Sequence, residues 1–110
     1  METFEGKAHL PGTKGDMRIG LEIDWGGKEV TVKLPEIAGA IKEWPGLAVQ
    51  TFGPEAEIAF RTKGIPTLFT HWWHFSRGEG GRLAGIVLAT PDAGGIWRTC
   101  LVEMERMGES

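Results

Sequence analysis

Apolar and polar residues alternate along most of this chain, and the alternation is clearest between residues 17 and 34. Every second residue on both sides of the doublet Gly26-Gly27 is apolar, and most of the residues between them are charged or polar. A two-residue turn at the doublet pairs Ile23 with Val30, and this register puts both apolar rows on the same face. The pattern predicts a β-hairpin with one face toward the core and one toward solvent.

The same alternation predicts one strand before this hairpin and five strands after it, which makes eight in all. In the first strand Phe4, Ala8 and Leu10 have the inward parity, whereas charged and polar residues have the other. Glycine doublets, which permit the positive φ of tight turns, separate several of the later segments. The later strands are expected at residues 47–52, 56–62, 67–76, 82–90 and 96–106.

Residues 35–44 have a different period, which indicates one short helix. A proline suits the first turn of a helix, and Ile37, Ile41 and Trp44 would share one helical face. Pro45-Gly46 would then end the helix. We expect this helix to cover a barrel mouth or a sheet edge.

Two of the later strands, at residues 67–76 and 82–90, carry apolar residues on both faces. The pattern leaves open which face of the strand at 67–76 points inward, because each face carries a tryptophan. A strand of this kind is buried on both sides, so its outer face needs a cover from the short helix or from another subunit. We expect a homodimer whose interface contains Trp72, Ile86 and Leu88.

Short connections between many strands favour a closed sheet. An open edge in a chain of 110 residues would invite pairing with other chains, and a closed or nearly closed meander removes that edge. There is no internal repeat, low-complexity segment or linker, so residues 1–110 are expected to form one domain. The predicted fold is all-β: an antiparallel β-barrel of about eight strands with one short helix. The alternative is a β-sandwich.

Composition narrows the classes of function. The formal net charge is -3 and the basic residues are scattered, so we expect no nucleic-acid binding. The single cysteine cannot form an internal disulfide or a Cys-rich zinc site. No apolar run approaches the roughly 18 residues of a membrane helix, and the N-terminal residues are too charged for a signal peptide. We expect a cytoplasmic protein without membrane contact.

A series of short motifs spans nearly the whole chain. In chain order they are Phe4-x-Gly6, Leu10-Pro11-Gly12, Leu21-x-Ile23, Leu34-Pro35, Gly46-Leu47, Ile58-x-Phe60, the segment 75–85, Leu101 and Arg106. This order resembles small lipocalin-like (calycin-type) β-barrel modules, including those found ahead of some α/β-hydrolase domains. The resemblance implies an interior that holds a small apolar ligand, and it implies no catalytic residue.

His71 belongs to the more aromatic row of the strand at 67–76, which makes this row the better candidate for the lining of the interior. A polar group among aromatic rings can orient a ligand by a hydrogen bond. The alternative is a core histidine bonded to a neighbouring backbone group. We expect a small apolar or aromatic ligand in a pocket lined by Ile58, Phe60, Phe69, His71, Trp73 and Phe75.

The spacing of His71 and His74 argues against a shared metal ion. Residues three apart in a strand point to opposite faces, so one ion cannot reach both side chains unless a bulge intervenes. The sequence therefore predicts no metal site at this pair, and a substitution of one histidine should not affect the other.

No group of residues has the pattern of a catalytic site. The two serines lack the Gly-x-Ser-x-Gly of a hydrolase elbow, and Cys100 is expected to be a buried, inert thiol. Glu103 and Glu105 share a strand face, but their charged neighbours indicate a solvated surface row. Residues 78–81 form a glycine loop that precedes a strand, so a hairpin turn is expected there. We expect a protein that binds a small molecule and has no enzyme activity or cofactor. The alternative is a protein-interaction or homodimerising module without a ligand.

Overall fold

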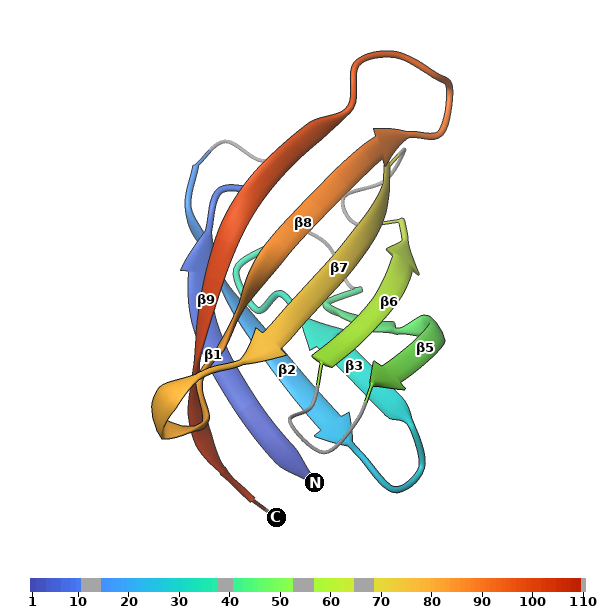
Figure 1. The fold of residues 1–110 in the computed structure, drawn as a ribbon. Helices are drawn as coiled ribbons and strands as arrows, with labels where there is room; N and C mark the ends of the chain where they lie inside the picture. Colours follow the sequence, from blue (N-terminus) through green and yellow to red (C-terminus); the bar gives the residue numbers. More distant parts are fainter. Residues whose placement is uncertain (11–14, 38–40, 53–56, 65–68, 110) are drawn as a thin grey trace.

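In the part of the chain that the structure describes, nine strands form one antiparallel sheet that curls into a nearly closed barrel (Figure 1). The structure is a computed structural model that describes residues 1–10, 15–37, 41–52, 57–64 and 69–109. The predicted all-β barrel is confirmed. The strands are β1 (Glu2–Ala8), β2 (Met17–Asp24), β3 (Glu29–Lys33), β4 (Glu43–Pro45), β5 (Leu47–Phe52), β6 (Glu57–Lys63), β7 (Phe69–Arg77), β8 (Leu83–Pro91) and β9 (Arg98–Glu109).

The order of the strands in the sheet is β4-β3-β2-β1-β9-β8-β7-β6-β5. Strands that are consecutive in the chain are neighbours in the sheet, except β4 and β5, which form its two edges. The pairing of β1 with β9 joins the first strand to the last. Figure 1 shows these two strands side by side, with the N and C marks close together. No helix among the described residues is long and apolar enough to cross a membrane.

The hairpin formed by β2 and β3 has the register that the sequence predicts. Ile23 lies opposite Val30, and both side chains are buried. In the turn, the amide of Gly27 donates to a carboxylate oxygen of Asp24 at 3.1 Å. The inward rows of this hairpin and of β1 pack against those of β6, β7, β8 and β9 in one core.

The helix expected at residues 35–44 is wrong for the residues that the structure describes; residues 38–40 lie outside them. The chain turns after Leu34, whose carbonyl accepts a hydrogen bond from the Ile37 amide at 3.2 Å. Trp44 then lies in the additional strand β4, opposite Val32. The side chain of Trp44 is buried there, and three apolar positions at helical spacing cannot offset the gain from extending the sheet.

Gly46 lies between β4 and β5, the two strands at the edges of the sheet. Its amide donates to the carbonyl of Val30 at 2.8 Å, and a Cβ atom at this position would collide with the Val30 side chain. Only glycine lets the backbone pass so close to β3 before it joins β6. Gly46 therefore links the two edge strands directly, and we call the gap between β4 and β5 the seam of the barrel.

The register of β7 settles which face of this strand points inward. Its pairing with β8 is continuous from Phe69 to Arg77, without a bulge. His71 and Trp73 are buried inside the barrel, whereas Trp72 and His74 are exposed on the outer wall. The two histidines thus lie on opposite faces, as their spacing predicts.

Candidate functional site

The six residues predicted to line a pocket all lie on the inner wall formed by β6 and β7. The ring centroids of Phe69 and His71 are 6.2 Å apart, and the ring of Trp73 follows at 6.0 Å from His71. Phe60 stacks on Trp73 at 5.8 Å with an interplanar angle of 9°. Ile58, Phe60, His71, Trp73 and Phe75 are buried, and Phe69 is partly exposed at the start of β7.

His71 is the one residue of this inner wall whose polar atoms lack partners in the described part of the structure. Its side chain has no exposed surface, and neither Nδ1 nor Nε2 has a hydrogen-bond partner among the described residues. Burial lowers the pKa of the imidazole from 6.5 to about 4, so it is neutral at pH 7. Among the described residues, the alternative of a core histidine whose side chain is bonded to a neighbouring backbone group is not observed.

Next to His71, the buried polar groups of Thr62 and Trp73 form a hydrogen bond with each other. Thr62 lies directly across from His71 on β6 and is also fully buried. Its hydroxyl oxygen accepts a hydrogen bond from Nε1 of Trp73 at 2.9 Å. The indole nitrogen is thus partnered within the protein, unlike the imidazole nitrogens of His71.

The outer wall of β7 and β8 carries the three predicted interface residues, Trp72, Ile86 and Leu88. Trp72 lies opposite Leu88, and Ile86 lies opposite Leu101. Trp72 is 43% exposed, Ile86 49% and Leu101 79%. The outer patch consists of Trp72, Ile86, Leu88 and Leu101. Sequence reasoning missed Leu101, although it has the outward parity of a strand in which Val102 and Met104 face the core.

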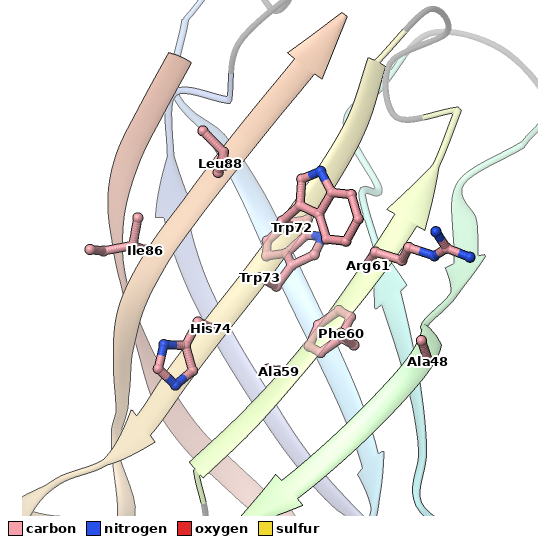
Figure 2. Close-up of a pocket in the computed structure, with 9 residues that line it drawn as sticks. All are labelled: Ala48, Ala59, Phe60, Arg61, Trp72, Trp73, His74, Ile86 and Leu88. Carbon is pink, nitrogen blue, oxygen red and sulfur yellow. The ribbon is translucent and has the colours of Figure 1, made fainter. Parts of the chain in front are cut away.

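A hollow of about 430 Å³ lies on this outer wall, across β5, β6, β7 and β8 (Figure 2). Ala48 and Ala59 contribute only methyl groups to its lining, whereas Trp72 and Arg61 contribute large side chains. The guanidinium carbon of Arg61 is 5.8 Å from the centroid of the Trp72 ring, and Nε of Arg61 is buried with no hydrogen-bond partner among the described residues. His74 also lines the hollow, with Nε2 at 3.7 Å from a carboxylate oxygen of Glu57.

A third polar cluster lies at the far end of β7 and was not foreseen from the sequence. One carboxylate oxygen of Glu2 accepts hydrogen bonds from Nε1 of Trp25 at 2.6 Å and from Arg77 at 2.7 Å. The other oxygen accepts from Nε of Arg106 at 2.8 Å. The hydrogen bond from Arg77 is the largest cause that lowers the pKa of Glu2 from 4.5 to about 2. The sequence does contain a signal for this cluster, because Glu2 is a charged residue with the inward parity of Phe4.

The remaining sequence candidates lie apart from these clusters on β9 and in the loop before β8. Cys100 is partly buried against the core, and burial raises the pKa of its thiol. Glu103 and Glu105 are exposed, and Glu105 pairs with Arg82 at 3.3 Å. Among the described residues, no three histidine, cysteine, aspartate or glutamate side chains are placed to hold a metal ion together. The glycine loop contains a short 3₁₀ turn, Glu79–Gly81, between β7 and β8.

Comparison with protein-family models, with curated proteins and with solved structures gives no significant match. The candidate sites therefore depend on the geometry of this chain. The lipocalin-like resemblance stays a prediction beyond the barrel architecture itself.

Proposed function

We propose that this barrel binds a small, uncharged and largely apolar molecule in its interior, with His71 as the group that orients it. The observation that carries the proposal is the fully buried imidazole, whose two nitrogens have no hydrogen-bond partner in the described part of the chain. A buried polar group without a partner costs roughly 1–3 kcal/mol. A guest with one hydrogen-bonding group would remove that cost, and this is the kind of polar contact that fixes orientation in apolar pockets.

The chemistry of the inner wall supports a neutral ligand. The imidazole is uncharged because burial lowers its pKa to about 4, so it offers one donor and one acceptor. An anion would find no positive charge next to His71, whose ring neighbours are Phe69 and Trp73 and whose neighbour across the sheet is Thr62. Phe69 is partly exposed at the end of the column, next to His71. An aromatic body that stacks on Phe69 or Trp73 and bears one N–H, hydroxyl or carbonyl group suits this arrangement.

Binding of the neutral fluorescent amine N-phenyl-1-naphthylamine tests the proposal. We expect a dissociation constant below about 100 μM, with quenching of tryptophan emission. His71→Leu should weaken binding by about tenfold, because the hydrogen bond to the probe is lost. His74→Leu is the matched control: it makes the same change on the same strand but on the outer wall, and it should bind as the unmodified protein does.

Native mass spectrometry of protein purified from its own host tests the same site without a chosen probe. A copurified neutral molecule that is lost in the His71→Leu variant supports the proposal. Equal binding by the His71→Leu and unmodified proteins would remove the role of His71. If the probe does not bind and no molecule copurifies, the inner wall is core alone and the proposed function is wrong.

A further inference from the structure

The outer patch is preformed and no described segment of the chain covers it. Nε1 of Trp72 donates to the hydroxyl of Thr90 at 3.3 Å, and the guanidinium of Arg61 lies over the other side of the indole. These two contacts hold the large ring in place on the sheet. Ile86 and Leu101 extend the apolar surface across β8 and β9. Contiguous exposed apolar surface of this kind marks a contact site with another molecule.

Beside the outer patch, acidic and basic side chains lie at opposite ends of β6. Glu57 lies at the start of β6, and Arg61 and Lys63 lie toward its end. Within the described residues, Arg61 and Lys63 have no carboxylate within ion-pair distance, and Glu57 has only His74, at 3.7 Å. One side of the patch is therefore acidic at one end and basic at the other, and its charges are left for a partner.

A second copy of this chain complements both features when its strands run in the opposite direction. A two-fold axis parallel to the sheet and perpendicular to the strands sets patch against patch, as an isologous contact requires. It also brings Lys63 opposite Glu57 of the partner subunit. The same axis places Arg61 of the partner subunit over Ala59, where the hollow lies (Figure 2).

The other simple orientation, with the axis parallel to the strands, brings β6 opposite β9 of the partner subunit. Glu57 then lies across from Glu103 of the partner subunit. Ser76, Ala84 and Glu103 pair in one row, and Glu57 comes one residue before Ile58, which pairs with Phe75. Like charges in that position oppose association. We propose that the outer patch is the interface of a homodimer in which the two sheets pack face to face with antiparallel strands.

Sedimentation velocity at protein concentrations from about 5 to 100 μM tests the proposal. We expect a dimer for the unmodified protein and a monomer for Trp72→Glu, since a buried carboxylate among apolar groups is strongly unfavourable. Ile86→Lys should also be monomeric, and circular dichroism checks that both variants remain folded. Met107→Glu is the matched control: Met107 is 60% exposed on β9 but lies beside Glu5 and Arg18 instead of the outer patch.

A charge exchange tests the orientation. Lys63→Glu should weaken the dimer by about tenfold, because it sets two glutamates against each other at each end of the interface. The double variant Lys63→Glu/Glu57→Lys should restore association, since the pair is rebuilt with the signs reversed. An axis parallel to the strands predicts instead that Glu57→Lys alone strengthens the dimer.

Three outcomes would overturn the proposal. A monomeric unmodified protein at 100 μM would leave the patch to a different protein or to a small molecule in the hollow. A dimer that survives Trp72→Glu would have its interface elsewhere. A double charge variant that associates no better than Lys63→Glu would exclude the antiparallel arrangement.

Discussion

The two ends of strand β7 hold buried polar side chains in opposite conditions. At one end, Arg77 binds the carboxylate of Glu2, and Trp25 and Arg106 complete the shell of donors. Toward the other end, His71 has no hydrogen-bond partner for its side chain among the described residues. The first end is closed by a charged network that spans β1, β7 and β9, and the second contains a neutral group among aromatic rings.

The carboxylate of Glu2 has hydrogen-bond donors and stabilises the fold, whereas the imidazole of His71 has no partner among the described residues and does not. A buried carboxylate is tolerated because three donors replace its water, and Arg77 also lies over the rings of Trp25 and Phe4 at 5.3 and 5.9 Å. An imidazole that is buried without a hydrogen-bond partner lowers the stability of the fold. Departures from the local rules of folding are expected at functional sites, so the His71 end is where a ligand is expected to act.

The largest effect is expected from Arg77→Met. It leaves the Glu2 carboxylate buried with only Arg106 and Trp25, and loss of one partner of a buried ion pair costs about 3–5 kcal/mol. The free energy of unfolding in urea measures the change. Arg82→Met is the control, because the pair of Arg82 with Glu105 is exposed and should contribute less than about 1 kcal/mol. Equal losses of unfolding free energy in the two variants would show that the Glu2 network stabilises the protein no more than an exposed ion pair does.

Acid should destabilise the closed end at low pH. The folded-state pKa of Glu2 is about 2, below its ordinary value of 4.5, so the unfolded chain binds the proton first. The associated stability is complete above pH 4.5 and is lost as the pH falls toward 2, by about 3 kcal/mol in total. Urea unfolding as a function of pH should show this loss, and Glu2→Gln should remove it. A Glu2→Gln variant with the same slope would contradict the network.

Acid should destabilise the His71 end in a higher range. The folded-state pKa of His71 is about 4, below its ordinary value of 6.5, so the unfolded chain again binds the proton first. Stability is complete above pH 6.5 and falls as the pH decreases toward 4, by about 3 kcal/mol. The His71→Leu variant should lack this part of the pH dependence, whereas Glu2→Gln should keep it. A His71→Leu variant that retains the slope would assign it to other groups.

A smaller loss is expected from Trp25→Phe. The phenyl ring keeps a face for Arg77 but cannot donate the hydrogen bond that Glu2 accepts at 2.6 Å. A hydrogen bond to a charged group contributes about 1.5–3 kcal/mol, and the loss should lie at the lower limit because two arginines remain. Thermal unfolding measures it. Trp72→Phe on the outer wall, studied as a monomer at low concentration, provides the comparison and should change stability less.

The smallest effect is a gain at the His71 end. His71→Leu removes an unpartnered polar group and keeps a side chain of similar size, so stability at pH 7 should rise by about 1 kcal/mol. Urea unfolding at neutral pH tests this. A clear loss of stability would mean that the imidazole has a partner that it needs, and the contrast between the two ends would disappear.

The sequence predicted the fold well where one face of a strand is core and the other is wet. The register of Ile23 with Val30 follows from alternation, because one slipped residue would expose an apolar row. The continuous pairing around His71 does not, because both faces of that strand are apolar and the sequence leaves a bulge open. Strand β4 was missed since it has only three residues, and Trp44 is at helical spacing from Ile37. Its pairing with β3 is a long-range gain that local periodicity does not contain.

The sites were predictable in part. Parity placed His71 and Trp73 on one face, but the tryptophan at 72 made the inward direction of β7 ambiguous, because the outer wall is also apolar there. The Glu2 network depends on three strands that meet only in the folded barrel. Charged residues at the inward parity of strand ends, such as Glu2 and Arg77, are the local signal that can reveal such a network.

Gly46 also influences how this protein can aggregate. A sheet edge is a template for further strands, and the two edges here, β4 and β5, face each other across one residue. β4 ends in Pro45, which has no amide hydrogen to donate, and β5 has a register shift near Ala48, whose φ is +51°. Each edge therefore carries a feature that opposes the addition of a further strand, so the native barrel should be a poor template for an amyloid-like fibril.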